Sequence, residues 1–259
     1  MVKKLLPKLF ITLVPSARGV QLAAQQRKDT KLIKRYERLD IDNVDDLKNE
    51  LRKLQRGIAI SYIVVLETVV EAQGVIYDLE NVQQSLSIDE SSVEMVRVAE
   101  WGIYLTKDQL NATHKRFKFC GLDLLYSPYS LLHFFYKDQI VNHDGFYTLL
   151  SDTMVVGMVF KEGKLLFSEM VAMKHNSNLF LEFVDQDSYY NIIIDMIKHY
   201  YKLKDASATF IEQIYIADSL NLEVRLENRL EEELFVEVNK RSIDISETLG
   251  VMAELELEI

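Results

Sequence analysis

Few residues in this 259-residue chain are arranged as enzymes arrange them for catalysis or metal binding. The five histidines are scattered, with no pair four residues apart: His114, His133, His143, His175 and His199. Helical zinc sites need such a pair, because it places two imidazoles on one helix face. The single cysteine, Cys120, stands at the apparent end of a helix, and nothing indicates a partner histidine or an oxyanion site beside it. We therefore expect no metal site and interpret Cys120 as a small buried thiol.

The composition narrows the class of protein. With 48% hydrophobic and 27% charged residues, the chain has the balance of an ordinary soluble globular protein. A net charge of −10 argues against nucleic acid as the main partner, because phosphate binding needs clustered Lys and Arg. One cysteine allows no internal disulfide and fits a reducing compartment. No apolar stretch approaches 18 residues, so we expect no membrane span and a cytoplasmic location.

The charge is unevenly distributed along the chain. Residues 1–38 carry ten Lys or Arg against two acidic residues, a balance of +8. Residues 219–259 carry four basic residues against eleven acidic ones, a balance of −7. A basic N-terminal hairpin could bind anionic lipid, with a binding free energy of about 1 kcal/mol per well-placed cation. The alternative is a hairpin whose Lys and Arg side chains simply face water.

The elements that must position any site alternate between strands and helices. Residues 9–14 and 20–25 predict two strands joined by a turn that contains Pro15 and Gly19. Apolar residues spaced three or four apart predict an amphipathic helix over 44–54, capped by Asn43 and ended by Gly57. The other elements predicted in the first half are strands over 32–39, 58–66, 72–77 and 94–105, a helix from Thr106 to Gly121, and a strand over 122–126. The strand over 72–77 is expected to pair with the one over 58–66.

The second half of the chain repeats this pattern. Pro128 is expected to start a helix that runs to about residue 137. The elements predicted after it are strands over 146–151, 154–161 and 164–171, a helix over 188–201, a strand over 211–216, a helix over 222–230, a strand over 234–238 and a closing helix over 245–255. Aromatic residues in two of these helices, at 134–136 and 200–201, predict either an exposed apolar patch or helices covered on two sides.

Residues 11–22 read Ile-Thr-Leu-Val-Pro-Ser-Ala-Arg-Gly-Val-Gln-Leu. They resemble the phosphate-binding hairpin of the actin-like ATPase superfamily, with its hydrophobic frame kept. Val14 stands where that family has its magnesium-associated aspartate, and Thr12 and Ser16 replace two glycines. Backbone N–H groups cradle phosphate only where glycine permits a close approach, and Mg²⁺ needs waters held by carboxylates. The resemblance therefore implies the fold of an ATPase without its first phosphate site.

A second resemblance lies in residues 105–132. There a helix ends at Gly121-Leu122, a strand follows, and Pro128 opens a leucine-rich helix. This order is similar to the crossover between lobes in the type IV pilus assembly protein PilM and the type II secretion protein GspL. GspL-type proteins are themselves degenerate in their nucleotide loops, and in this respect the chain looks closer to that branch.

Two more stretches resemble nucleotide-binding elements of the superfamily. Residues 147–167 look like the second phosphate hairpin, in which Asp152 is the only carboxylate near enough to replace the family's aspartate. Residues 211–219 look like the strand that leads to a glycine pair beside the adenosine, with Ala217-Asp218 in place of the glycines. The resemblance thus places Ser16, Asp152 and Asp218 around a vestigial nucleotide cleft, with no catalytic residue and neither ATP nor Mg²⁺ expected to be required.

The resemblance implies a two-lobed actin-like, ribonuclease H-like α/β fold with mixed sheets flanked by helices. We expect lobes over 1–127 and 128–259. The implied function is a non-catalytic scaffold at the cytoplasmic face of a type II secretion, type IV pilus or DNA-uptake machine, peripheral to the inner membrane. Its partners would be a membrane protein's cytoplasmic peptide, an assembly ATPase or a second copy of the chain.

Two alternatives remain open at this point. The first is an ATP-binding or ATP-hydrolysing enzyme, actin-like or related to sugar kinases, that uses Asp152 and Asp218. The second is an unrelated α/β binding domain whose order of elements coincides with the superfamily's. Nucleotide would stabilise the first and leave the scaffold unaffected.

Overall fold

The computed structural model describes residues 6–16, 19–80, 89–173, 186–203 and 210–257. By its internal contacts the chain divides into two compact units, each built from separate stretches of sequence. The first unit comprises Met1–Thr68, Asp108–Leu131 and Asp244–Ile259, and the second comprises Val69–Lys107 and Leu132–Ile243. These bounds differ from lobes over 1–127 and 128–259, because the C-terminal helix belongs to the first unit and residues 69–107 to the second.

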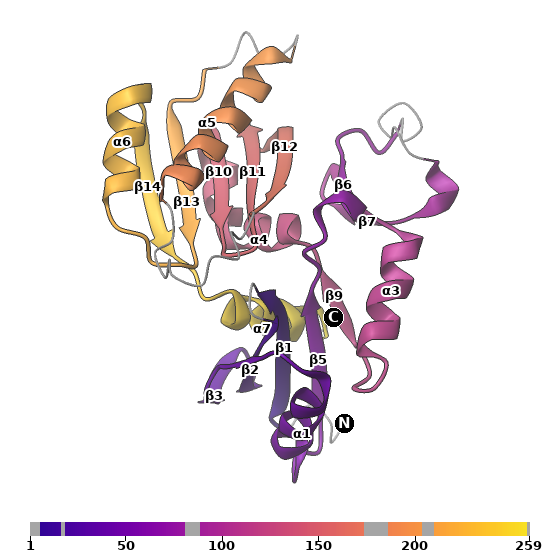
Figure 1. Ribbon diagram of the computed structural model, residues 1–259. Helices are drawn as coiled ribbons and strands as arrows, with labels where there is room; N and C mark the ends of the chain where they lie inside the picture. Colours follow the sequence, from indigo (N-terminus) through magenta and orange to yellow (C-terminus); the bar gives the residue numbers. More distant parts are fainter. Residues whose placement is uncertain (1–5, 17–18, 81–88, 174–185, 204–209, 258–259) are drawn as a thin grey trace. The chain divides into compact units, whose positions relative to one another are not determined.

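A six-stranded sheet forms the centre of the first unit (Figure 1). Its strands are β1 (Lys8–Ser16), β2 (Gly19–Lys28), β3 (Lys31–Arg35), β4 (Leu39–Ile41), β5 (Ser61–Leu66) and β9 (Leu124–Tyr126). The order is β3-β2-β1-β5-β9, and β4 also pairs with β2. β1 runs antiparallel to β2 and parallel to β5, and β5 runs parallel to β9.

The two faces of this sheet are covered differently. On one face Leu9, Ile11 and Leu13 of β1 pack in a core that includes residues of α1 (Val44–Gln55) and α3 (Lys107–Phe117). Asn43 caps α1 as predicted, since its side chain accepts from the Asp46 N–H at 2.8 Å. The closing helix α7 (Ile245–Glu256) contacts β1, β2 and β5. Because side chains alternate along a strand, Gln25 and Arg27 of β2 both face α7.

A buried ion pair joins α7 to β2. Arg27 Nε donates to Glu254 Oε2 at 2.7 Å, and both side chains are almost fully buried. Further hydrogen bonds complete the group: Arg27 donates to Gln25 Oε1 at 3.1 Å and to the Thr30 carbonyl at 2.7 Å, and the Thr30 N–H donates to Glu254 Oε1 at 3.1 Å. A buried pair is tolerated only when its remaining polar atoms are satisfied in this way.

The second unit contains a five-stranded sheet. Its strands are β10 (Gly145–Leu150), β11 (Met154–Lys161), β12 (Lys164–Ala172), β13 (Gln213–Asp218) and β14 (Glu237–Ser242), in the order β12-β11-β10-β13-β14. β10 is antiparallel to β11 and parallel to β13, and β13 is parallel to β14. If the short β4, which pairs with β2, is left out, the strands of both sheets run third, second, first, fourth, fifth in chain order.

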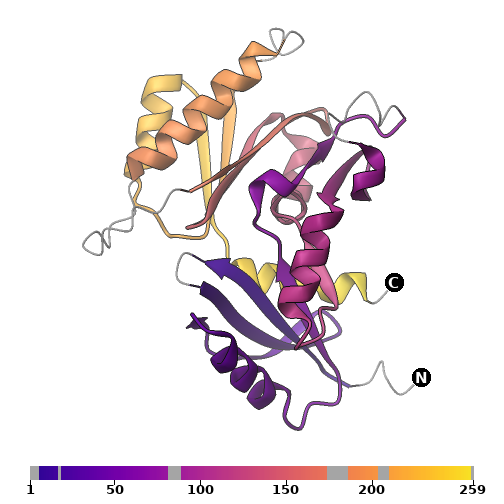
Figure 2. The ribbon, with the colours of Figure 1, turned by 45° about the vertical axis from the view of Figure 1, so that its right-hand side comes forward.

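Helices cover both faces of this second sheet. α5 (Gln186–Lys202) and α6 (Arg225–Leu234) lie together on one face (Figure 2), where Phe146, Ile193 and Leu230 share one core. On β10 the neighbouring residue Tyr147 points the other way, toward Tyr136 of α4 (Pro128–Asn142). Tyr147 also stacks on Tyr215 of β13, with ring centroids 4.5 Å apart.

A small third sheet also belongs to the second unit and corrects two predictions. It consists of β6 (Gln73–Ile76), β8 (Trp101–Thr106) and β7 (Val93–Val98), in that order. The strand predicted over 72–77 therefore pairs with β8 and not with the strand over 58–66. The single strand predicted over 94–105 is a hairpin, because Ala99 has a left-handed φ of 53° that turns the chain.

Two further element predictions need correction. The strand predicted over 32–39 is divided into β3 and β4, both paired with β2. Residue 234 ends α6, so the strand predicted over 234–238 starts three residues later, after Phe235 has closed the helix with a φ of 57°.

The aromatic helices are largely covered. Tyr136 and Tyr200 are buried, Phe134 and Phe135 are partly buried, and only Tyr201 of this set is exposed. Of the two alternatives left open by the sequence, this burial favours covered helices over an exposed patch. Within the described ranges, no helix combines the length and the apolar character needed to cross a lipid bilayer.

Candidate functional site

The carboxyl ends of β10 and β13 bring two of the predicted site residues to one edge of the second sheet. β10 and β13 are parallel neighbours in which Leu150 is paired with Asp218. Asp152 follows two residues after Leu150, in the turn to β11. Ser16 is the last residue of β1 and belongs to the first unit.

Asp218 is fully engaged by its own loop. Its carboxylate accepts the backbone N–H of Leu220 at 2.8 Å and that of Leu222 at 2.7 Å, and the residue is 1% exposed. The next residue, Ser219, donates both its N–H (3.1 Å) and its hydroxyl (2.8 Å) to the Leu150 carbonyl. Asp218 therefore shapes the loop between β13 and α6.

The turn after β10 is closed in the same manner. Ser151 Oγ accepts the Met154 N–H at 3.1 Å, and the Ser151 N–H donates to the Met154 carbonyl at 3.0 Å. Tyr189 of α5 donates its hydroxyl to the Ser151 carbonyl at 2.9 Å. Burial raises the pKa of Tyr189, and the negative charges of Asp152 and Asp218 raise it further. The hydroxyl therefore stays protonated and remains a donor to the turn.

These hydrogen bonds limit what the edge can bind. A phosphate site needs backbone N–H groups directed at the ligand. In this structure the N–H groups of Ser151, Met154, Ser219, Leu220 and Leu222 all donate to other atoms of the same two loops. The hydrogen bonds of these N–H groups therefore stabilise the two loops themselves.

The hairpin of the first unit also departs from a phosphate cradle. Thr12 is buried, and its hydroxyl donates to the Ala23 carbonyl across the hairpin at 3.2 Å. Val14 is buried, and Ser16 pairs with Gly19 to continue the ladder to its end. Gly19 has a φ of 135°, and a Cβ there would lie 2.3 Å from the Ile41 carbonyl oxygen. The hairpin tip, residues 17 and 18, lies outside the described residues.

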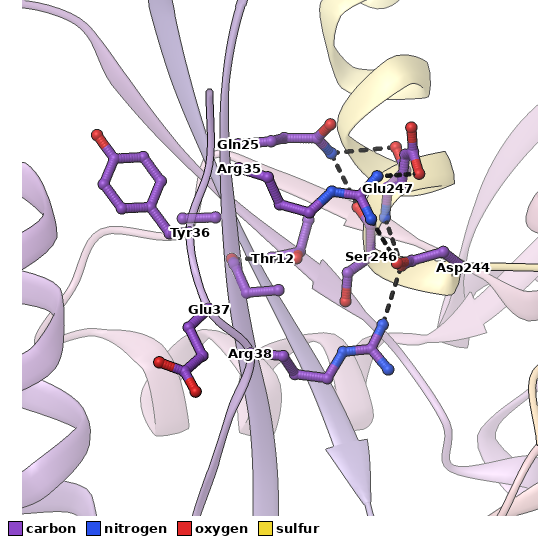
Figure 3. Close-up of a pocket in the computed structure, with 11 residues that line it drawn as sticks. Thr12, Gln25, Arg35, Tyr36, Glu37, Arg38, Asp244, Ser246 and Glu247 are labelled. Carbon is purple, nitrogen blue, oxygen red and sulfur yellow. Dashed lines mark hydrogen bonds and ion pairs between the residues drawn. The ribbon is translucent and has the colours of Figure 1, made fainter. Parts of the chain in front are cut away.

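A cavity of about 200 Å³ in the first unit is a second candidate site that the sequence did not reveal. Figure 3 shows Arg35 and Arg38 reaching toward the start of α7. Arg38 Nη2 lies 2.9 Å from Asp244 Oδ1, and Arg35 bonds both Asp244 and Glu247. The lining residues are Thr12, Ala23, Ala24, Gln25, Arg35, Tyr36, Glu37, Arg38, Asp244, Ser246 and Glu247.

Carboxylates outnumber arginines in this cavity, because Glu37, Asp244 and Glu247 line it together with Arg35 and Arg38. Asp244 caps α7 by accepting the Glu247 N–H at 2.9 Å, and it also pairs with both arginines. The hydroxyl of Ser246, a residue 3% exposed, has no hydrogen-bond partner among the described residues. The cavity is therefore polar but not an anion site, since its cations already have carboxylates. The only sequence signal for it was the Asp-x-x-Glu spacing of a helix start, which by itself predicts a cap.

The other candidate groups have structural roles. Burial raises the pKa of Cys120 to about 11, and its Sγ donates to the Phe117 carbonyl at 3.1 Å, so the thiol stays protonated near neutral pH. Across the described ranges, no three His, Cys, Asp or Glu side chains lie close enough together to hold a metal ion.

Two family models match the chain, one on each side of its middle. Residues 6–133 match a domain of unknown function, DUF8569, and residues 175–258 match another, DUF8341. No curated protein matches the sequence.

Solved structures show that the chain has an actin-like fold. A Bacteroides thetaiotaomicron protein with an actin-like ATPase fold and unknown function is similar with a TM-score of 0.57 and 11% identity, over 97% of each chain. The PilM-PilN type IV pilus biogenesis complex is similar with a TM-score of 0.57 and 10% identity, over 92% of this chain and 89% of that one. MreB 5 of Spiroplasma citri, bound to AMPPNP, is similar with a TM-score of 0.50 and 6% identity, over 97% of each chain. The predicted α/β, actin-like fold is confirmed.

Proposed function

We propose that this protein is a non-catalytic scaffold that docks protein partners and does not turn over nucleotide. One observation carries the proposal: in the loops after β10 and β13, where the resemblance places phosphate and adenosine contacts, five backbone N–H groups donate to carbonyl, carboxylate and hydroxyl oxygens of the same loops, namely those of Ser151, Met154, Ser219, Leu220 and Leu222. The burial of Val14, which replaces the magnesium-associated aspartate of the hairpin, supports it from the first unit.

The setting we propose is the cytoplasmic face of a type II secretion, type IV pilus or DNA-uptake machine. The similarity to the PilM-PilN complex supports it, because PilM in that structure is joined to a second protein of pilus biogenesis. The partner of this chain would be a cytoplasmic peptide of a membrane protein or a domain of an assembly ATPase. A second copy of the chain is a further candidate. Such partners would hold the scaffold peripherally at the inner membrane.

Thermal unfolding with and without millimolar Mg-ATP tests the absence of nucleotide binding. A ligand at 100 times its dissociation constant adds about 2.7 kcal/mol, which shifts the midpoint by several degrees in a chain of this size. We expect no shift with ATP, and none with ADP. A clear shift with ATP would favour the enzyme alternative, and phosphate release by wild type but not by Asp152→Ala would establish it.

Partner docking is tested separately, by affinity capture from cells that carry a pilus or secretion machine. We expect recovery of a component of that machine, confirmed by binding of the purified component. If purified components of all three machines fail to bind, the proposed setting is wrong even where nucleotide binding is absent.

A further inference from the structure

One edge of the first unit carries a row of lysines across three adjacent strands. Lys8 of β1 is paired in register with Arg27 of β2, and Lys28 of β2 is paired with Lys31 of β3. The β2–β3 turn, formed by Asp29 and Thr30, keeps these positions close together. Lys34 follows on β3, the outermost strand of the sheet (Figure 1).

Exposed aliphatic side chains lie among these cations. All five residues of β3, with the sequence Lys-Leu-Ile-Lys-Arg, are exposed. Leu32 is 41% and Ile33 52% exposed, and Ile33 lies at a register shift in the pairing of β2 and β3. Two adjacent exposed aliphatic side chains on an edge strand are an unusual surface to present to water.

A cavity of about 700 Å³ adjoins the same row of lysines. Leu6, Ile60, Tyr62 and Leu257 supply apolar walls, and Leu6 and Leu257 are themselves exposed. Lys8 and Lys28 line the cavity together with Asp29, Ala59, Ser61 and Glu254. Cations therefore border a recess whose walls are partly apolar and partly polar.

The acidic residues of this region leave a positive balance. Glu254 is neutralised by the buried Arg27, so neither contributes to the surface charge. Asp29 is the remaining carboxylate of the cavity wall. Lys28, Lys31 and Lys34 outnumber it, and Lys34 lies over the Tyr36 ring at 4.5 Å, where its ammonium stays exposed to solvent. The net charge of −10 is thus locally reversed.

We propose that this basic edge, defined as Lys28, Lys31, Leu32, Ile33 and Lys34 with the adjoining cavity, binds directly to a membrane surface that contains anionic lipid. Lysines near such a surface are attracted by its negative potential, and aliphatic side chains enter the boundary between headgroups and acyl chains. The aliphatic groups favour lipid over nucleic acid, whose phosphate backbone offers them no apolar phase, and an anionic bilayer supplies negative charge and an apolar layer along the same surface. The proposal is independent of the scaffold function, in which partners hold the protein at the membrane.

Co-sedimentation of the full chain with vesicles tests the proposal. We expect binding to phosphatidylcholine vesicles that contain 30% phosphatidylserine, little binding to phosphatidylcholine alone, and release as the salt concentration rises. The variant Lys28→Ala/Lys31→Ala/Lys34→Ala should bind at least about tenfold more weakly, since each lysine near the surface contributes roughly 1 kcal/mol. Leu32→Ser/Ile33→Ser should weaken binding while keeping the charge.

A matched control removes three exposed lysines elsewhere, as Lys115→Ala/Lys118→Ala/Lys164→Ala. It changes the net charge equally and should bind like wild type. The proposal is overturned if wild type fails to bind the anionic vesicles, which would leave an acidic protein as the partner of the lysines. It is also overturned if the control loses as much binding as the test variant, because the attraction would then not belong to this edge.

Discussion

Asp218 determines the conformation of the loop at the end of β13. Replacing it with alanine leaves the N–H groups of Leu220 and Leu222 without their acceptor, and each such loss costs about 1–3 kcal/mol when the donor is buried. We expect Asp218→Ala to lower the free energy of unfolding by about 2–4 kcal/mol, measured by urea denaturation. Asp218→Asn retains one acceptor oxygen and should lose less.

Asp195 provides the control for this prediction. It is an exposed aspartate of α5 whose carboxylate forms an ion pair with Lys198, three residues away. Asp195→Ala should change stability by less than about 1 kcal/mol. Equal losses at Asp195 and Asp218 would mean that the hydrogen bonds of the loop add nothing to stability.

His133 couples the stability of the second unit to pH. Its ring lies 5.4 Å from that of Trp101, and burial lowers its pKa below the ordinary value. Between about pH 6.5, where an unfolded histidine titrates, and the lower folded pKa, the unfolded chain binds more protons. Stability from this group is therefore complete above pH 6.5 and falls as the pH drops toward the folded pKa. His133→Phe should remove that part of the slope when both proteins are unfolded at several pH values. An unchanged slope would contradict the prediction.

The roles of single residues were the hardest to predict. The positions of Asp152 and Asp218 after two strands could be read from the sequence. The hydrogen bonds of Asp218 with the N–H groups of Leu220 and Leu222 could not be predicted from the sequence, because they depend on the path of a loop that has no periodicity. The grouping of Arg35 with Asp244 was equally hidden, since more than 200 residues separate them.

At the scale of elements, α7 lies against β2 at the distance that Gly250 permits. Gln25 donates to the Ser246 and Glu247 carbonyls at 3.0 Å each, and a Cβ on Gly250 would lie 1.6 Å from Gln25 Nε2. Glycine to alanine in a helix interior normally stabilises by about 1 kcal/mol. We expect Gly250→Ala to destabilise instead, by about 1–3 kcal/mol, since Gln25 must leave its place.

A double variant isolates the cause. Gln25→Ala removes the clash, so Gln25→Ala/Gly250→Ala should be at least as stable as Gln25→Ala alone in urea denaturation. If Gly250→Ala is more stable than wild type, the helix does not depend on this close approach.

Helices and strands with a regular apolar pattern were well predicted, and the turns that interrupt a strand were not. The helix over 44–54 was found within one residue of α1, because its apolar spacing and its Asn43 cap agree. The hairpin of β7 and β8 was missed because its turn uses Ala99 at positive φ, a residue that gives no turn signal. Pairing partners such as β6 and β8 depend on contacts between distant residues, which the local pattern does not contain.

At the scale of the whole molecule, we predict that returning the family's residues to the first hairpin alone does not restore nucleotide binding. Val14→Asp with Ser16→Gly returns the family's residues to the hairpin but leaves the loops of Ser151 and Asp218 closed. Calorimetry with Mg-ATP should therefore detect no binding by this variant, once circular dichroism has verified that it is folded. Micromolar binding would show that the first hairpin alone had decided the loss.

The repeated sheet order explains why the fold could be predicted while its division could not. Apart from the short β4, each half of the chain supplies three strands in antiparallel pairing and then two in parallel pairing, so the pattern is visible along the sequence. The compact units exchange segments across that pattern, because α7 completes the first unit from the far end of the chain. Sequence order indicates which elements exist, and only packing decides the unit that each one joins.

The pair of Arg27 and Glu254 joins residues 227 positions apart and has a consequence for synthesis. At 5–20 residues per second, a ribosome needs roughly 10–45 s to deliver the glutamate after the arginine. During that interval β2 presents Gln25 and Arg27 without their helix, while strands β10 to β14 emerge as one uninterrupted stretch. We expect the second unit to fold first on the nascent chain and the first unit to fold last. The sheet whose strands are made first is therefore the one that waits longest for its covering helix.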